Sequence, residues 1–530
     1  MHSNLYNSIH IERKKKIAVL GLILPILGSA AGCGASSAEI PIDGSTKAGE
    51  MGAENINYQV PSQIPNILVD QVGYDIDSEK TAVFRGEELP KQFYVCDQES
   101  GDIVYSAEIM KSVYNEDTGE YDSQGYFGDL KKEGSYYLYT DVLGESYSFE
   151  IKEDIYGEVF DKACKKYYVN RCGIALSESD AGGIAHSACH TSMARLQENP
   201  DVQLDVSGGW HMDAQAGRDT GMGSRIAENL LLAYEMNPTA FSDDSGISES
   251  GNGIPDILDE VKYEVDWLLK MQDSKTGGEY GAALTDASKS GDIFTAPVYV
   301  TPVDLKATIA FASTAARFSY LYQQFDPAYA TTCIKAADRA WTCFLNNRDV
   351  SKDTGAFKAA AQLYRATGSD TYHQVLISYF EREDLQELFE KDENVFLGAV
   401  TYLSINKQVD VDVCARLMKY LMRRSEDIAQ RASSSGYLVT QRSDDESFGK
   451  MLDEMRCLTI TDHIIYNHEY TTIIENHAHY LMGMNPQAIN YVTDDTQRTY
   501  AQENVTGVMR VPENNALFIF MLSVLEQKKP

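Results

Sequence analysis

Apolar residues follow two different periods along the chain, and the period changes near Tyr156. Short runs rich in β-branched and aromatic residues come first, and turn-forming segments separate them. These runs cover residues 66–74, 92–97, 102–109, 134–140 and 145–151. Short runs separated by turns are typical of antiparallel strands, so we predict a small β-sandwich over residues 66–152.

After Tyr156 the apolar residues repeat at helical spacing. Ile257, Val261, Val265 and Leu268 show this period within 254–273. The other helical segments are 159–176, 223–237, 304–325, 328–347, 356–368, 371–383, 472–483 and 516–527. Many helices with short connections indicate an all-α domain over 156–530, with paired helices in a closed ring or a superhelix.

The N-terminus carries a targeting pattern. Basic residues at 13–16 precede an apolar run over 17–30 that has the length of a signal-peptide core and is short for a membrane span. The run ends at Ala30-Ala31-Gly32-Cys33, which resembles a bacterial lipoprotein cleavage site; the alternative is a plain signal peptide with an incidental cysteine. We expect a lipoprotein signal over 1–33, lipid on Cys33, a flexible linker over 34–65, and a protein on the extracellular face of the cell membrane.

The charge balance argues against one class of binding partner, nucleic acids. The chain has 46 Lys+Arg against 79 Asp+Glu, a net charge of -33, and such a surface repels phosphate backbones. We therefore expect no nucleic-acid partner, and we expect a monomer. The nine cysteines are scattered along the chain, which excludes a disulfide scaffold.

Several phrases, taken in order, resemble one family of enzymes. They are ILVDQVGYDIDSEKTAVF (67–84), YYVNRCGIAL (167–176), DVSGGWHMDAQAGRDT (205–220), SGNGIPDILDEVKYEVDWLLKMQD (250–273) and NNALFIFMLSVL (514–525). The chain resembles glycoside hydrolase family 9, in particular members with an N-terminal immunoglobulin-like domain. The resemblance implies an Ig-like β-sandwich followed by an (α/α)6 barrel, and hydrolysis of β-1,4-glucans with inversion.

A group of cysteines and histidines suggests a metal site. Cys172, His186, Cys189 and His190 follow the pattern C-x13-H-x2-C-H, and Cys2His2 is a tetrahedral set typical of structural zinc. Since Cys189 and His190 are adjacent, both bind one ion only if the chain turns there. The alternative is buried cysteines beside surface histidines. The family resemblance also implies zinc in this stretch, as a clamp between loops near the cleft. It further implies calcium, for which we assign no ligands.

The motif that supplies the catalytic base of the expected reaction is altered. Inversion needs one carboxyl group as acid and another that activates water. In the family, Gly-Gly-Trp and one further residue precede Asp-Ala-Gly-Asp, whose second Asp is the base. Without gaps, Met212 and Gln215 stand at the two Asp positions; with one inserted residue, Asp213 recovers the first and Ala216 takes the second. We predict Asp213 as the catalytic carboxylate, with Asp219 second; the alternative is a loop acid that binds backbone amides.

The C-terminal side is altered as well. The family's His-His-Arg turn, which grips sugar hydroxyls, is missing after Tyr491. Glu513 lies just before Asn515-Ala516, which match the family's Asn-Ala, and we predict it as the general acid. Glu503 is the rival, and an acid that favours a helix N-terminus is the alternative role of Glu513.

Trp210 and His211 are predicted to line the substrate cleft, with core packing as the alternative for Trp210. The chain has only three Trp, which favours short oligosaccharides over crystalline cellulose. Two hypotheses follow. The first is a surface-anchored glycoside hydrolase that cleaves β-linked glucans or oligosaccharides. The second, motivated by the altered motifs, is an inactive family member that binds glycans at the cell surface.

Overall fold

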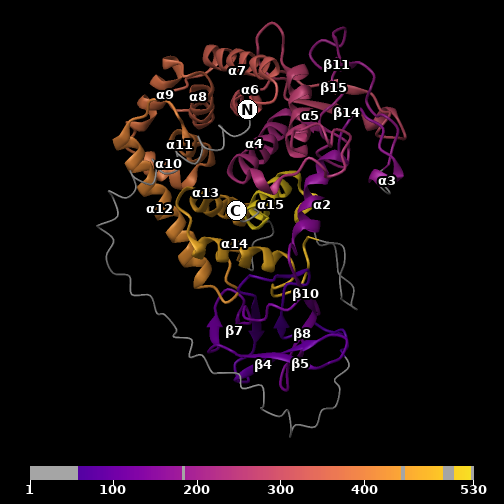
Figure 1. The fold of residues 1–530 in the computed structure, drawn as a ribbon. Helices are drawn as coiled ribbons and strands as arrows, with labels where there is room; N and C mark the ends of the chain where they lie inside the picture. The colour runs from indigo at the N-terminus through magenta and orange to yellow at the C-terminus, as the bar shows by residue number, and fades with distance from the viewer. Residues whose placement is uncertain (1–57, 182–184, 443–447, 493–506, 527–530) are drawn as a thin grey trace. The chain divides into compact units, whose positions relative to one another are not determined.

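The protein is a β-sandwich followed by a helical barrel (Figure 1). This computed structural model describes residues 58–181, 185–442, 448–492 and 507–526. The predicted signal over 1–33, the lipidated Cys33, most of the linker 34–65 and Glu503 lie outside the described residues. Within the described ranges, no helix combines the length and the apolar character that crossing a membrane requires.

Two sheets form the sandwich. One has the strand order β1-β3-β7-β6, and the other has the order β2-β10-β8-β4-β5 with β9 paired to β8. In β4, Phe93 and Val95 are buried while Gln92 is exposed and Tyr94 half-buried, which is the alternation expected of a strand with one face in the core. The strands are β1 (Ile67–Leu68), β2 (Gly73–Asp75), β3 (Thr81–Arg85), β4 (Gln92–Asp97), β5 (Ile103–Glu108), β6 (Val113–Asn115), β7 (Glu120–Tyr126), β8 (Gly134–Thr140), β9 (Gly144–Glu145) and β10 (Phe149–Lys152).

A buried pair joins the sandwich to the helical domain. His479 Nδ1 lies 2.9 Å from Asp70 Oδ2, and the two side chains are 1% and 0% exposed. Tyr480 and Met484 also pack into the apolar core of the sandwich. Both His479 and Tyr480 belong to α14 (His468–Leu481), so this helix forms part of the contact with the sandwich.

The helical domain is an (α/α)6 barrel, as predicted. Its inner helices are α4 (Thr220–Met236), α6 (Leu305–Tyr322), α8 (Thr354–Thr367), α11 (Glu393–Ser404), α13 (Gly449–Ile465) and α15 (Pro512–Leu525). Helices that cover them are α2 (Gly157–Tyr168), α5 (Asp256–Met271), α7 (Pro327–Asn347), α9 (Asp370–Phe380), α12 (Val411–Ser433) and α14, with α10 (Leu385–Lys391) beside them. An unbroken run of α15, Asn515–Ser523, is buried, as expected for a helix with neighbours on all sides.

Two local expectations change. The helix predicted over 159–176 ends at Tyr168, because Arg171 pairs with Trp210 in a β-bridge and Gly173 takes a φ of +91°. Helices α10, α11, α12 and α13 add to the segments named from the sequence.

Aspartates define where the inner helices begin. Asp219 Oδ1 accepts the amide of Met222 at the start of α4, and Asp304 Oδ1 accepts that of Ala307 at the start of α6. Asp353 does the same for α8. Side-chain caps of this kind satisfy amides that have no partner within the helix.

A third sheet lies beside these helix starts. It has the order β12-β11-β15-β14-β13 and consists of β11 (Ala194–Leu196), β12 (Gln203–Leu204), β13 (Arg218–Asp219), β14 (Ala282–Thr285) and β15 (Val298–Val300). Asp219 pairs with Ala282 in this sheet and also caps α4. The sheet therefore fixes the position of the first turn of α4.

Candidate active site and metal centre

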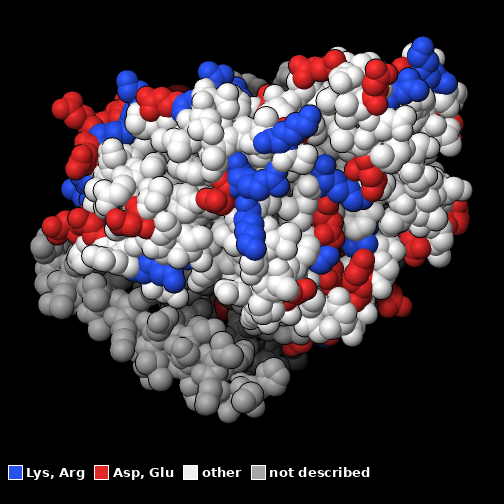
Figure 2. Space-filling view, turned by 90° about the horizontal axis from the view of Figure 1, so that it is seen from above, with Lys and Arg blue, Asp and Glu red and all other residues white. Residues whose placement is uncertain are grey.

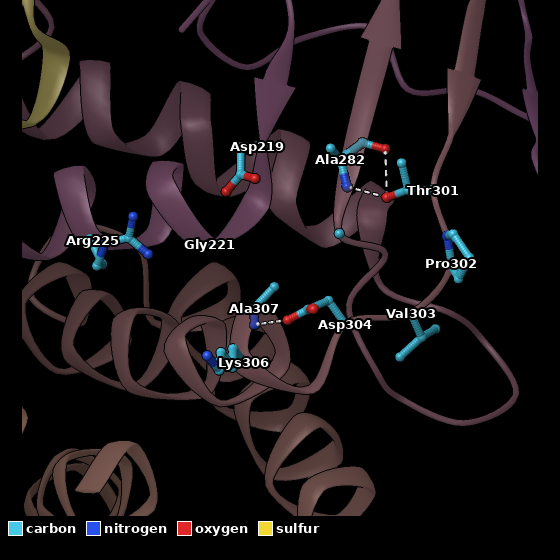
Figure 3. A pocket seen from close by; sticks show the side chains of 11 residues that line it. Asp219, Gly221, Arg225, Ala282, Thr301, Pro302, Val303, Asp304, Lys306 and Ala307 are labelled. Atoms are coloured by element: carbon cyan, nitrogen blue, oxygen red, sulfur yellow. Dashed lines mark hydrogen bonds between the residues drawn. The ribbon is translucent and has the colours of Figure 1, made fainter.

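A pocket of about 480 Å³ opens where α4 and α6 begin (Figure 3). Asp219, Gly221 and Arg225 line it from the α4 side, and Asp304 and Lys306 from the α6 side. The loop 301–303 and residues 281–282 complete its wall. A pocket of this size is within the range of small-molecule sites, and its charged groups of both signs suit a hydroxyl-rich ligand.

Asp213 lies in a tight loop, and its side chain binds backbone amides of that loop. Its Oδ1 accepts the amides of Gln215 at 2.9 Å and Gly217 at 2.8 Å. Met212 donates its amide to the carbonyl of Gly217, and Ala216 takes a φ of +56° between them. The Asp213 carboxylate thus has the loop-stabilising role that was the alternative to catalysis, while its side chain is still exposed to solvent.

Glu513 lies in the first turn of α15 and reaches α4. Its Oε1 accepts a hydrogen bond from Arg225 Nε at 2.7 Å. Since Arg225 lines the pocket, this ion pair places Glu513 next to it. The helix-terminal position agrees with the alternative role of Glu513, and the contact with Arg225 was not expected from the sequence.

Trp210 lies in the core and not on a cleft surface, which corrects its predicted role. It is 1% exposed and its ring packs at a tilt against that of Tyr167, with ring centroids 4.8 Å apart. Its Nε1 donates to Glu260, and its amide donates to Glu264 at 2.9 Å. A buried Trp needs a partner for its N–H, and Glu260 supplies it.

Burial favours the uncharged form of the two carboxyl groups that bind Trp210, those of Glu260 and Glu264. Burial raises the pKa of Glu264 to about 8 and that of Glu260 to about 7, although Arg171 lowers the latter. Glu264 Oε1 is buried without a hydrogen-bond partner among the described residues and lies against Gly223. A Cβ on Gly223 would stand 2.0 Å from this oxygen, so glycine makes room for the carboxyl group.

Three of the four predicted metal ligands converge, and His211 is the fourth member. Ligand atoms of Cys172, Cys189, His190 and His211 all lie within 4.8 Å of one another, and all four residues are buried. Cys172 Sγ is 3.7 Å from Cys189 Sγ and 3.4 Å from His190 Nδ1, and Cys189 Sγ is 3.6 Å from His211 Nε2. Zinc with its usual bond lengths gives tetrahedral edges of about 3.4–3.8 Å, so these residues fit zinc.

His186 is outside this set, which corrects its assignment as a ligand. It is partly exposed, its Nδ1 bonds to the carbonyl of Ser187 at 2.7 Å, and its ring stacks on Phe294. His211, predicted to line the substrate cleft, takes its place. The turn expected at the adjacent ligands is present, because His190 has a φ of +48°.

The outer contacts of the cluster also suit a metal. His190 Nε2 lies 2.8 Å from the carbonyl of Ile293, which orients the ring with Nδ1 toward the sulfurs. The hydrogen bond between the two sulfurs lowers the pKa of Cys189 and raises that of Cys172, so the pair readily loses one of its two protons. Calcium stays a prediction, since the described residues contain no other metal-binding group of this kind.

The sequence did not point to Arg225, Asp304 or Lys306 as site residues. Asp304 and Lys306 lie at a predicted helix start, which was a usable signal, because the mouth of such a barrel is built from the starts of its inner helices. Figure 2 shows that the face seen from above carries clusters of both charges, despite the net charge of -33.

The fold and the site belong to a glycoside hydrolase. Residues 156–514 match glycosyl hydrolase family 9, and residues 62–145 match the cellulase N-terminal Ig-like domain. The chain therefore belongs to glycosyl hydrolase family 9 and is a cellulase-like glycoside hydrolase.

Individual relatives agree with this family. Endoglucanase D of Acetivibrio thermocellus is 26% identical over 471 residues, covering 82% of this chain and 73% of that protein. Cellodextrinase of Butyrivibrio fibrisolvens is 25% identical over 485 residues, covering 82% and 85%.

Solved structures share the fold. A metagenome-derived family 9 endoglucanase superposes with a TM-score of 0.75 at 23% identity and covers 87% of this chain and 99% of that chain. A Zn-binding triple mutant of a family 9 endoglucanase has a TM-score of 0.74 at 23% identity and covers 86% and 100%.

Proposed function

We propose that this protein is a surface-anchored enzyme that hydrolyses β-linked glucans or their oligosaccharides with inversion. The observation that carries the proposal is the pocket at the starts of α4 and α6 within a family 9 barrel. Endoglucanase D and the cellodextrinase are relatives named for such substrates. With few Trp in the chain, oligosaccharides are the preferred substrates.

Two carboxylates would carry the reaction, Glu513 as acid and Asp213 as base. Glu513 is adjacent to the pocket through Arg225, which supports its role. Asp213 is exposed, but one of its oxygens is engaged by two amides. Asp219 lines the pocket with one oxygen bound to the α4 amide, so it is the second candidate for the base.

A second function, glycan binding without cleavage, is favoured because Asp213 and Asp219 each use one carboxylate oxygen to bind backbone amides. If neither Asp213 nor Asp219 activates water, the protein binds glycans at the cell surface without cleaving them. Gln215 supports this alternative, because an amide accepts a hydrogen bond from water but takes no proton from it near neutral pH.

A panel of β-linked oligosaccharides with NMR of the products separates the two functions. Hydrolysis with anomeric inversion that is lost in Asp213→Asn or Glu513→Gln supports the proposed enzyme and its residues. Turnover that survives both changes, and is lost in Asp219→Asn, moves the base to Asp219. Binding without turnover by the wild type supports the glycan-binding alternative.

We also propose that Cys172, Cys189, His190 and His211 hold a structural zinc ion. The buried Cys2His2 set leaves no open position for substrate, so the metal would tie the loops around 172, 189 and 211 together. Since His211 lies in loop 207–217, two residues before Asp213, the metal would also hold the segment that carries Asp213. One equivalent of zinc in protein purified without chelator is the expected result of elemental analysis.

Membrane anchoring rests on the sequence around Cys33. We propose that the mature chain begins with a lipid-modified Cys33 and that residues 34–65 act as a flexible linker. Radiolabelled palmitate should enter the wild-type protein and not the Cys33→Ala variant. Label in both variants, or in neither, would exclude the anchor.

A further inference from the structure

We propose that the pocket at the starts of α4 and α6 is a subsite for a sugar unit that bears a carboxylate, such as a uronic acid. The inference rests on the proposed function in that the ligand is a glycan. It adds a chemical class of substrate that the family relationship does not specify.

The first argument concerns the acids in the pocket. Asp219 and Asp304 both line it, and each is already committed to a helix start through its Oδ1. The N-terminus of a helix carries about half a positive charge, which offsets a carboxylate placed there. Neither aspartate therefore repels an anion as strongly as an isolated carboxylate would.

The second argument concerns the cations. Lys306 lines the pocket and is exposed, and among the residues that the structure describes its ammonium group has no ion-pair or hydrogen-bond partner. Arg225 uses its Nε for Glu513, which leaves its Nη atoms for a ligand. Lys306 is therefore a cation for which the described residues supply no partner, and a negatively charged group of a ligand would complement it.

The third argument concerns space. Gly221 forms part of the pocket wall, and a Cβ there would stand 3.4 Å from Asp219 Oδ1, 3.6 Å from Arg225 Nη1 and 3.7 Å from Ala307 Cα. The backbone of Gly221 has no left-handed conformation that would require glycine. These are ordinary van der Waals distances, so a Cβ would fit there but would fill part of the pocket wall beside the guanidinium of Arg225 (Figure 3).

Together these groups recognise a pyranose that carries a carboxylate. Lys306 and the Nη atoms of Arg225 donate to the carboxylate, and charge-assisted hydrogen bonds of this kind are about twice as strong as neutral ones. The free oxygens of Asp219 and Asp304 accept from ring hydroxyls. A neutral glucose unit can donate its hydroxyls to the two aspartates, but it has no carboxylate for the lysine and the arginine to bind.

Calorimetry on the full-length protein tests this subsite with two probes, cellotetraose and cellotetraose in which one unit is oxidised to glucuronic acid. We expect the acidic probe to bind about tenfold more tightly at low salt, from one additional charge-assisted contact. The preference should disappear in Lys306→Met and shrink at high salt. It should persist in Lys289→Met, which removes an exposed lysine that does not line the pocket.

Equal affinity for the two probes, no measurable binding of either, or a preference that survives Lys306→Met would each overturn the inference. Hydrolysis of neutral cello-oligosaccharides, followed in the same preparations, keeps the two proposals apart. Cleavage without preference for the acidic probe removes the subsite and leaves the proposed enzyme. Preference without cleavage of any probe removes the proposed enzyme and leaves the subsite.

Discussion

Arg225 on α4 and Glu513 on α15 form an ion pair across two inner helices of the barrel, with 2.7 Å between Nε and Oε1. The two side chains are 50% and 36% exposed, so solvent screens the pair and its contribution to stability is only about 0–1 kcal/mol. The ion pair instead positions the Glu513 carboxylate beside the pocket, whose other carboxylates, Asp219 and Asp304, cap two helices.

Removing the charge of Glu513 tests this position. If Glu513 is the general acid, Glu513→Gln lowers kcat about 100-fold or more, and the free energy of unfolding changes by less than about 1 kcal/mol. Glu387→Gln is the matched control, because Glu387 is an exposed glutamate paired with Lys391 far from the pocket in sequence. Turnover in Glu513→Gln within twofold of wild type would show that another group donates the proton.

Loss of the metal clamp should destabilise the protein. Cys189→Ser removes a thiolate from the buried Cys2His2 set and should lower the zinc content and reduce the midpoint of thermal unfolding by about 5 °C or more. Cys414→Ser, in a partly exposed cysteine outside the cluster, should leave both unchanged. An unchanged zinc content in Cys189→Ser would place the metal elsewhere.

His186 and His211 discriminate between the ligand set expected from sequence and the one in the structure. His211→Ala should reduce the zinc content of the purified protein, whereas His186→Ala should leave it unchanged. The reason is that His211 Nε2 lies 3.6 Å from Cys189 Sγ, while His186 Nδ1 is bonded to a backbone carbonyl. The opposite result would restore His186 as the ligand.

The buried carboxyl group of Glu264 should make stability depend on pH. Its pKa is about 8 in the folded protein, so between about pH 4.5 and 8 the unfolded chain has released a proton that the folded chain keeps. Stability is therefore lost as pH rises through this window, by up to about 1.4 kcal/mol per pH unit. Glu264→Gln lacks this proton, so its stability relative to wild type should increase with pH and level off above pH 8.

Urea unfolding at several pH values measures this difference. The exposed residue Glu383 provides a control, because Glu383→Gln should follow the wild-type curve. Parallel curves for wild type and Glu264→Gln would show that the Glu264 carboxyl group ionises in the folded protein as freely as in the unfolded chain.

Gly209 should be required for space as well as for conformation. It has a φ of +75°, and a Cβ there would stand 2.6 Å from Cδ2 of the buried Trp267. Gly144 has a similar φ of +78° with nothing within 4 Å, so Gly144→Ala should cost only about 1 kcal/mol of conformational strain. Gly209→Ala should cost at least about 1 kcal/mol more. Equal losses in chemical denaturation would mean that Trp267 moves aside freely.

The repeat of apolar residues was enough to predict both domains. In β4 the alternation of Phe93 and Val95 with outward-facing neighbours indicates a strand without knowledge of the rest of the chain. The spacing of Ile257, Val261 and Val265 does the same for α5, because one buried face repeats every three to four residues. The quoted motifs then predicted the family, which the comparisons confirmed.

Tertiary contacts decided what the individual site residues do. Cys172, Cys189 and His190 were predictable as a group, but the choice of His211 over His186 depends on which loop folds back onto the sulfurs. The sequence around Trp210 is compatible with a cleft or a core, and only the tertiary structure shows that it is buried, with its N–H groups bound to Glu260 and Glu264. Arg225 meets Glu513 across 288 residues, because a closed ring brings its first and last inner helices together. Periodicity is a local property that sequence determines by itself, whereas a site assembled from distant loops depends on ring closure.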